Sequence, residues 1–206
     1  MVCADSRVSK DTVCRGCFGW YDRSGGVCES IHNNRPRLAV LTSSFWVAFY
    51  DALYLFVRDD SLRLMNWGFA SLNESVVVDQ QSYQKQLYTE VVRGIEFDAD
   101  AENSRLLEVG CGNGGGLKHI QKHFGDSVLC EGVDLSSSKN VISSMKFGVT
   151  TRSDDAERLS TCNDHDYSIV VNVERSHCYS DFESFAQAVK RVLRPAGYFC
   201  YTYFAL

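Results

Sequence analysis

A glycine-rich segment in the middle of the chain constrains the fold more than any other feature. Residues 107–116 read Leu-Glu-Val-Gly-Cys-Gly-Asn-Gly-Gly-Gly, between the apolar run Arg105–Val109 and a helical pattern that continues to Phe124. Glycines at such a junction let the backbone turn sharply and approach a ligand closely, and the start of the helix presents free N–H groups. This order of strand, loop and helix predicts a βαβ unit with a ligand at the carboxyl end of its strand.

The second half of the chain alternates apolar runs with amphipathic stretches. The run Tyr167–Val173 is almost continuously apolar, which is typical of a strand buried on both faces. The alternation predicts the α/β class, with a doubly wound, mostly parallel sheet of Rossmann-like type. The expected strands are Arg105–Val109, 127–133, 148–151, Tyr167–Val173 and 198–204, the expected helices are 114–124, 137–146 and 182–193, and a turn is expected at 195–197.

The first half of the chain lacks this alternation and predicts a different organisation. We expect a cysteine-containing, disordered extension over residues 1–37, a helical lid or cap region over 38–103, and the core over 104–206. Apolar residues recur at helical spacing over 44–57, and again over 76–95. In the second of these helices the apolar side is expected to hold Val77, Tyr83, Leu87, Val91 and Val92.

The cysteines indicate free thiols and not a disulfide framework. There are nine of them, spread over the whole chain, which favours a reducing compartment and a cytoplasmic protein. In the extension, Cys14, Cys17, Cys28 and His32 have a spacing that a single zinc ion could use. The second pair does not have the spacing of a standard zinc knuckle, so we predict no metal site.

Charge and hydropathy bear on the partners. The net charge of −5 weighs against a nucleic acid, because binding a phosphate backbone usually needs a basic surface. Residues 38–57 are mostly apolar and long enough to cross a bilayer, but they contain Asp51 and several hydroxyl residues. Membrane association is therefore not favoured, and we expect an amphipathic helix packed on the domain.

Acidic positions around the glycine loop bear on which ligand it binds. Gly110, Gly112 and Gly115 also fit the dinucleotide pattern G-x-G-x-x-G, so a nicotinamide oxidoreductase is a rival interpretation. Glu108 stands two residues before the first glycine, a form typical of S-adenosylmethionine sites. Its carboxylate can accept a hydrogen bond from the ligand's ammonium and would be unwelcome beside a pyrophosphate. Asp134, at the end of the second strand, can bind both ribose hydroxyls of either cofactor.

A further acidic residue follows the third strand. In methyltransferases of this fold an acidic residue at the position of Asp155 receives the adenine amino group, although Asp154 and Asp155 taken alone fit a helix N-cap equally well. Taken with Glu108 and Asp134, Asp155 makes S-adenosyl-L-methionine the expected cofactor. The full predicted cofactor-binding set is Glu108, Gly110, Gly112, Gly114, Asp134, Leu135, Asp155, Ala156 and Asn172.

Two longer strings resemble a known family. Residues 172–179 read Asn-Val-Glu-Arg-Ser-His-Cys-Tyr and residues 192–199 read Val-Leu-Arg-Pro-Ala-Gly-Tyr-Phe. Both resemble the phthiotriolone and phenolphthiotriolone dimethylphycocerosate methyltransferases. The resemblance implies a class I, S-adenosylmethionine-dependent O-methyltransferase acting on a small-molecule or lipid-like hydroxyl. It also implies a cofactor-covering lid at residues 65–69, Met-Asn-Trp-Gly-Phe.

The same resemblance predicts an incomplete sheet. The family fold has seven strands, whereas the sequence stops at Leu206, just after the fifth, so the last two strands and the substrate-capping insert are expected to be missing. Residues 198–204 would then form an open, aromatic edge strand that favours self-association. Ala196 stands where the family has the first glycine of its Arg-Pro-Gly-Gly turn.

His177 is the predicted catalytic residue. It follows the fourth strand, at the sheet edge where ligands bind, and a base with a pKa near neutrality suits removal of a hydroxyl proton. Glu174 is a candidate for orienting His177 or touching the cofactor. Two alternatives stay open: His177 is an ordinary loop histidine, and the chain is a non-catalytic S-adenosylmethionine-binding protein or an inactive truncated homologue.

Overall fold

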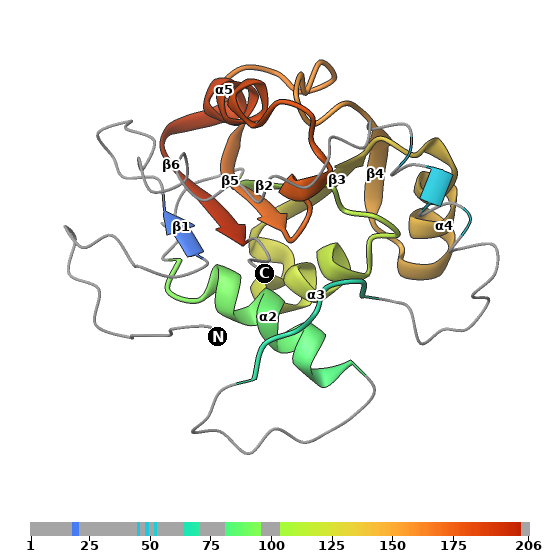
Figure 1. Ribbon diagram of the computed structural model, residues 1–206. Coiled ribbons are helices and arrows are strands. Elements are labelled where there is room, and N and C mark those ends of the chain that lie inside the picture. The colour runs from blue at the N-terminus through green and yellow to red at the C-terminus, as the bar shows by residue number, and fades with distance from the viewer. Residues whose placement is uncertain are drawn as a thin grey trace.

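The computed structural model describes residues 18–20, 45, 48–49, 52, 64–70, 81–95 and 104–202. In this part of the chain a six-stranded sheet carries helices on both faces (Figure 1). The strands are β1 Phe18–Trp20, β2 Arg105–Val109, β3 Leu129–Asp134, β4 Thr150–Ser153, β5 Tyr167–Val173 and β6 Leu193–Thr202. The helices are α2 Ser82–Val92, α3 Gly115–Phe124, α4 Ser137–Phe147 and α5 Phe182–Val192, with short 3-10 turns η3 Gly125–Ser127 and η4 Ser176–Cys178.

The strand order confirms the predicted doubly wound fold. The sheet runs β1-β6-β5-β2-β3-β4, and the five strands from β2 to β6 are parallel to one another. From β2 the chain moves outward through β3 to β4, then returns to pair β5 on the other side of β2. The direction of winding therefore reverses between β2 and β5, and crevices at such a point are where ligands bind in open α/β sheets.

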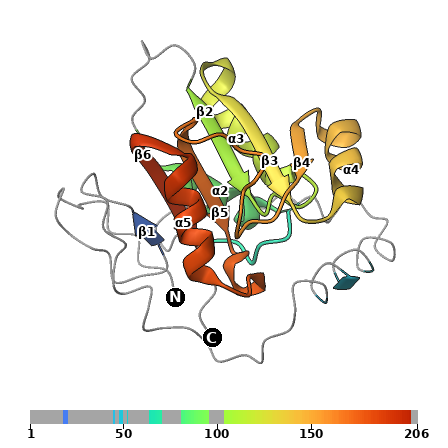
Figure 2. The same cartoon turned by 90° about the horizontal axis from the view of Figure 1, so that it is seen from above.

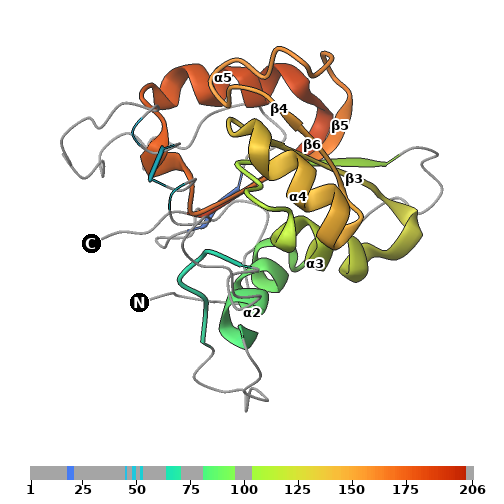
Figure 3. The same ribbon diagram turned by 90° about the vertical axis from the view of Figure 1, so that its right-hand side faces the viewer.

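The helices form two layers, one on each face of the sheet (Figures 2 and 3). α5 covers one face, while α2, α3 and α4 lie on the other. Alternate residues of β2 are buried in the two hydrophobic cores, one on each face of the sheet. Leu106 belongs to the core that contains Leu117 of α3, and Leu107 belongs to the core that contains Phe185 of α5. On α5 the side chains of Phe185, Val189 and Val192 are buried, and so is Leu193, the first residue of β6.

The edge of the sheet differs from the prediction. β1 pairs antiparallel with β6, with Phe18 opposite Thr202 and Trp20 opposite Cys200. The open edge predicted for this part of 198–204 is therefore wrong, and so is disorder at residues 18–20, because the N-terminal segment takes up the unpaired backbone groups of β6. The rest of the extension, including the zinc candidates Cys14, Cys17, Cys28 and His32, lies outside the described residues.

The last parallel strand begins earlier than predicted. β6 runs directly from α5, starting at Leu193, so residues 195–197 lie within the strand and do not precede it. Its pairing with β5 is irregular near Tyr167 and Ile169, and Ala196 has a φ of 63°. Pro195 and Gly197, which predicted a turn, lie at this irregularity, and β6 continues as a strand beyond it.

The helix before the glycine loop presents a different face from the predicted one. α2 begins at Ser82, after Gln81 in a left-handed conformation. Leu87, Val91 and Val92 are buried as expected, but Tyr83 is 40% exposed and Tyr88 is only 8% exposed. The burial of Tyr88 instead of Tyr83 brings a phenol hydroxyl into the interior beside β2.

The helix predicted over 44–57 is described at only a few positions. Phe45 and Phe49 are helical and stack with their ring centres 6.2 Å apart, but they are 44% and 47% exposed. Among the described residues no helix has the length and hydropathy to span a membrane.

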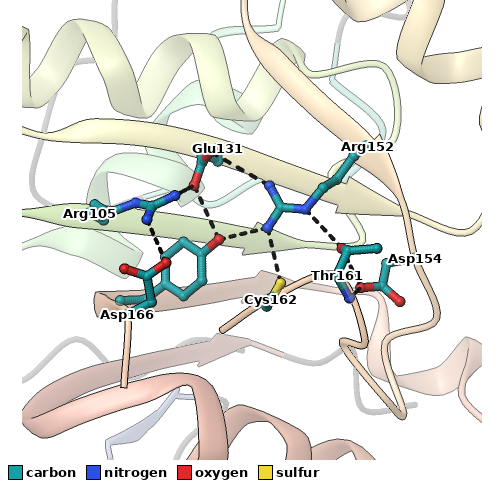
Figure 4. A network of polar contacts seen from close by, with 8 residues as sticks. Arg105, Glu131, Arg152, Asp154, Thr161, Cys162 and Asp166 are labelled. Atoms are coloured by element: carbon teal, nitrogen blue, oxygen red, sulfur yellow. Dashed lines mark hydrogen bonds and ion pairs between the residues drawn. The ribbon is translucent and has the colours of Figure 1, made fainter. Parts of the chain in front are cut away.

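A network of polar side chains joins four parallel strands on the face that α5 covers (Figure 4). Glu131 of β3 lies at its centre, accepting hydrogen bonds from Arg105 of β2 at 2.5 Å and from the Tyr167 hydroxyl of β5 at 3.1 Å. Arg152 of β4 pairs with Glu131 at 3.6 Å and donates to the same hydroxyl at 2.6 Å. Because Arg105 and Tyr167 are the first residues of their strands, the network stabilises the amino ends of the strands.

We predict that Glu131→Gln destabilises the fold by about 2 kcal/mol, because Arg105 and Arg152 lose a charged acceptor in a largely buried position. Urea denaturation followed by circular dichroism measures the change. Glu183→Gln, an exposed substitution of the same kind on α5, is the control and should change the free energy of unfolding by less than about 0.5 kcal/mol. Equal stability of the two variants would contradict the central role of Glu131.

Candidate cofactor site

The glycine loop is fixed to the neighbouring strand by its backbone. The N–H groups of Gly110 and Cys111 both donate to the Val133 carbonyl oxygen, at 2.8 and 3.1 Å. Gly110, Gly112 and Gly114 all have positive φ angles of 76°, 55° and 82°. A β-carbon at Gly110 would lie 2.9 Å from a side-chain carbon of Arg175, so this glycine meets both a conformational and a spatial requirement.

Asp134 ends β3 and lies directly below the loop. Its Oδ2 accepts the Gly112 N–H at 2.9 Å, and its Oδ1 accepts the Ser136 N–H at 3.1 Å. Two cations flank the carboxylate: Lys139 Nζ lies 3.5 Å from Oδ1 and an Arg175 guanidinium nitrogen lies 3.5 Å from Oδ2. Burial raises the pKa of Asp134, but Arg175, Lys139 and the backbone donors outweigh it, so the net pKa is lowered and the group stays ionised.

A hollow opens beside Asp134 at the carboxyl ends of the strands. Leu135 is 44% exposed there, an apolar side chain left uncovered at the rim. Asp155 and Ala156 form the opposite side, so the structure brings together most of the predicted cofactor-binding residues. The lining consists of Val109, Gly110, Val133, Asp134, Leu135, Asp154, Asp155, Ala156, Glu157, Arg175, Cys178 and Tyr179.

The loop that carries Asp155 is organised by its neighbour. Asp154 accepts from the backbone and hydroxyl groups of both Ser160 and Thr161, and from the Asp155 N–H at 2.8 Å. Thr161 Oγ1 in turn accepts from Arg152 Nε at 2.9 Å. The polar network of Figure 4 therefore extends from the amino ends of the strands to the ligand hollow. The carboxylate of Asp154 therefore holds this loop in place, whereas the side chain of Asp155 is 44% exposed and accessible to a ligand.

Glu108 lies on the other side of the loop, buried on the α2 and α3 face. Its Oε1 accepts a hydrogen bond of 2.7 Å from the Tyr88 hydroxyl. Its Oε2 is buried without a hydrogen-bond partner among the described residues. Burial raises the pKa of Glu108 to about 8, although the hydrogen bond from Tyr88 opposes that rise. A buried acceptor with one unused oxygen fits a cationic ligand group.

Asn172 holds the strands together below the hollow. Its amide nitrogen donates to the Val109 carbonyl oxygen at 2.9 Å and to the Tyr179 hydroxyl at 2.7 Å. The side chain is fully buried, and its Oδ1 has no partner in the described part of the chain. Asn172 therefore contributes by positioning β2 and Tyr179, while its direct contact with a ligand stays a prediction.

His177 lies in η4, just beyond β5, and its side chain is exposed. The two following residues, Cys178 and Tyr179, line the hollow, whereas His177 is not among its described lining residues. Partial burial and then the charge of Arg175 lower the pKa of His177 below its ordinary value. The imidazole is therefore neutral at physiological pH, as a base must be.

A segment of the predicted lid lies across this edge of the site. The Trp67 N–H donates to Glu174 Oε2 at 2.8 Å, and a β-carbon at Gly112 would contact the Met65 side chain at 3.7 Å. Glu174 has a φ of 51°, which is unusual for a residue other than glycine. This conformation turns the backbone at the end of β5. Residues 64–70 thus connect the glycine loop to the segment after β5.

Comparison with known proteins agrees with this geometry. Residues 106–197 match the model of a methyltransferase domain. The chain is 33% identical over 159 residues to the fatty-acid O-methyltransferase of Mycolicibacterium smegmatis, covering 71% of this chain and 54% of the relative. It is 27% identical over 163 residues to the phthiotriol/phenolphthiotriol dimycocerosates methyltransferase of Mycobacterium tuberculosis, covering 76% and 58%. Residues 106–197 are a methyltransferase domain, and its fold is that of class I.

Solved structures agree on the class I fold of this domain. A [4+2]-cyclase, SpnF, superposes with a TM-score of 0.64 at 19% identity, over 78% of this chain and 59% of the cyclase. A geranyl diphosphate methyltransferase in complex with its cofactor gives 0.55 at 18% identity, over 67% and 61%. This chain spans little more than half the length of the curated relatives, so activity and substrate are treated as proposals below.

S-adenosylmethionine is the cofactor, and the residues present fit it. The unpartnered Oε2 of buried Glu108 suits the ammonium group, and exposed Leu135 together with half-buried Ala156 suits a flat aromatic ring. We infer that Asp134 binds the ribose hydroxyls and Asp155 the adenine amino group. Each carboxylate oxygen of Asp134 accepts one backbone N–H and has a further lone pair with which to accept a ribose hydroxyl.

The sequence interpretation missed three residues of this site. The apolar side of α2 was assigned to Tyr83, whereas Tyr88 lies next to Leu87 and three residues before Val91, on the side that is buried. Lys139, nearly fully buried in the first turn of α4, and Arg175, in the string after β5, gave no signal of their own. Their roles depend on the position of Asp134, which only the assembled sheet defines.

We predict that Asp134→Asn weakens binding of S-adenosylmethionine at least tenfold, because the amide loses charge-assisted hydrogen bonds worth about 1.5–3 kcal/mol each. Isothermal titration calorimetry measures the dissociation constant. Asp164→Asn, at an exposed aspartate paired with Arg191, is the matched control and should bind as the wild type does. Wild-type affinity in Asp134→Asn would remove Asp134 from the site.

Proposed function

We propose that the chain carries the cofactor-binding part of an O-methyltransferase that acts on a lipid-like acceptor. One observation supports it most: Cys178 and Tyr179, the two residues that follow His177, line the hollow beside Asp134. All three belong to the string that resembles methyltransferases of lipid-like substrates. The names of the two relatives, a fatty-acid O-methyltransferase and a phthiotriol/phenolphthiotriol dimycocerosates methyltransferase, support an oxygen acceptor on a lipid.

The protein's main contribution to such a reaction is alignment. When bound, S-adenosylmethionine supplies a methyl group on a positively charged sulfur, which is already activated for in-line displacement. Holding the acceptor oxygen in line with that methyl can lower the barrier by about 7–11 kcal/mol. The fixed glycine loop, Asp134 and the Asp155 loop would hold the donor, while the segment after β5 lies on the side where an acceptor can approach.

His177 would supply the general base for a hydroxyl acceptor. A hydroxyl is a weak nucleophile until its proton leaves, and a neutral imidazole can take that proton as the oxygen attacks the methyl carbon and the carbon–sulfur bond breaks. The lowered pKa of His177 keeps it unprotonated at neutral pH. A fatty-acid carboxylate is ionised at the same pH and would need no base, so the two oxygen acceptors make different demands on His177.

A second candidate function is cofactor binding without turnover. The chain spans 54% and 58% of the two relatives, so the part of those proteins that it lacks could be needed for turnover. Transfer of labelled methyl groups to extracted lipids separates the candidates. Cofactor binding without any methyl transfer would favour the second.

We predict that His177→Ala lowers kcat with a long-chain alcohol by about 10²–10⁴-fold and leaves the dissociation constant of the cofactor within about twofold. The same variant should methylate a long-chain fatty acid at close to the wild-type rate. Because His177 must be neutral to act, the wild-type rate with the alcohol should rise with pH through a pKa below 6.5 and then level off, and this limb should be absent in His177→Ala.

Exposed His123 on α3 provides the control, since His123→Ala removes an imidazole away from the hollow. It should leave both rates unchanged. If His177→Ala transfers methyl groups to the alcohol at the wild-type rate, His177 is not the base and alignment alone accounts for catalysis.

A further inference from the structure

A buried tyrosine and a buried glutamate meet behind the glycine loop. Tyr88 of α2 donates its hydroxyl hydrogen to Oε1 of Glu108 on β2 at 2.7 Å. Tyr88 is 8% exposed and Glu108 is 1% exposed, so neither group has water as an alternative partner. A hydrogen bond of this length to a carboxyl group in the interior holds the carboxyl in one orientation.

The third glycine of the run 114–116 makes this contact possible. A β-carbon at Gly116 would lie 2.0 Å from a ring carbon of Tyr88 and 2.2 Å from its hydroxyl oxygen. No side chain fits in that space, so the first turn of α3 and the phenol ring are matched to each other. Gly116 therefore leaves the space that the Tyr88 ring occupies, and it is not itself a ligand contact.

The second oxygen of Glu108 is left unused by this arrangement. Oε2 has no hydrogen-bond partner among the described residues, and an unsatisfied buried acceptor is costly unless a ligand completes it. Glu108 stands two residues before Gly110, where the backbone turns towards the hollow. The two oxygens thus have separate tasks, one held by the protein and one available.

We propose that Tyr88 is a positioning residue for the cofactor, which holds one oxygen of Glu108 so that the other accepts a hydrogen bond from the ammonium group of S-adenosylmethionine. The inference rests on the cofactor assignment of the site but not on the identity of the methyl acceptor. Tyr88 itself touches neither the cofactor nor the acceptor in this account, and acts only through Glu108.

The arrangement couples cofactor binding to a proton. Burial and, to a smaller extent, the neighbouring Asp134 raise the pKa of Glu108 to about 8, although Tyr88, Arg175 and the backbone N–H of Leu117 oppose the rise. Cys111 is the other titratable neighbour, and burial keeps it a neutral thiol. The carboxyl is therefore largely protonated at pH 7, and a bound ammonium favours its ionised form, so binding should release a proton below about pH 8.

Removal of the tyrosine hydroxyl has a defined sign. The hydrogen bond from Tyr88 favours the ionised form of Glu108, so Tyr88→Phe raises the pKa of Glu108 further. More of the carboxyl is then protonated at any given pH, and binding of the cation becomes weaker. The pH above which binding no longer releases a proton should move upward.

Calorimetric titration of the whole chain with S-adenosylmethionine, between pH 6.5 and 9 in buffers of different ionisation enthalpy, measures both affinity and protons released. We expect Tyr88→Phe to bind about tenfold more weakly at pH 7.5 and to release protons up to a higher pH. Tyr83→Phe, which removes a hydroxyl from an exposed position of the same helix, is the control and should match the wild type in both quantities.

A second variant covers the case in which Tyr88→Phe disturbs the fold. Glu108→Gln should bind with no proton release near pH 7.5, and adding Tyr88→Phe to it should change the affinity by less than about twofold. Wild-type affinity and proton release in Tyr88→Phe, or unchanged proton release in Glu108→Gln, would overturn the inference. Failure of the wild type itself to bind S-adenosylmethionine would instead refute the cofactor assignment.

Discussion

The structure depends on the attachment of the glycine loop to the strand beside it. Three successive N–H groups, from Gly110 to Gly112, donate to the last two residues of β3, Val133 and Asp134. These bonds turn the chain at the end of β2 and direct it into α3, which packs on the face of the sheet that also receives α2. The hollow, the orientation of Asp134 and the place of Glu108 all follow from this attachment.

This arrangement buries two carboxyl groups, which is energetically unfavourable unless each is compensated. Asp134 and Glu108 are both nearly inaccessible, and a carboxyl group in such a place must be paired, bonded or protonated. Asp134 has two cations and two backbone donors, whereas Glu108 has one phenol hydroxyl and one unused oxygen. One buried oxygen of Glu108 therefore has no hydrogen-bond partner among the described residues, as expected of a residue that binds a cationic cofactor group.

Much of the core follows from sequence, because local patterns define it. β2 and β5 have the predicted bounds, the strand order is that of the predicted doubly wound fold, and Asp134, Leu135, Asp155 and Ala156 lie around one hollow. What the sequence did not reveal depends on contacts between distant segments. The pairing of β1 with β6, the burial of Tyr88 in place of Tyr83, and the guanidinium of Arg175 beside Asp134 are properties of the assembled sheet and leave no periodic signal.

The most direct test of the account is a calorimetric comparison of three ligands on the wild-type chain. S-adenosylmethionine, S-adenosylhomocysteine and NAD share an adenosine, but only the first two carry the ammonium group that Glu108 is proposed to accept. The account predicts that both methionine-derived ligands bind with one site per chain, and that NAD gives no heat of binding at the same concentrations. Binding of NAD with comparable affinity, or no binding of S-adenosylhomocysteine, would contradict it.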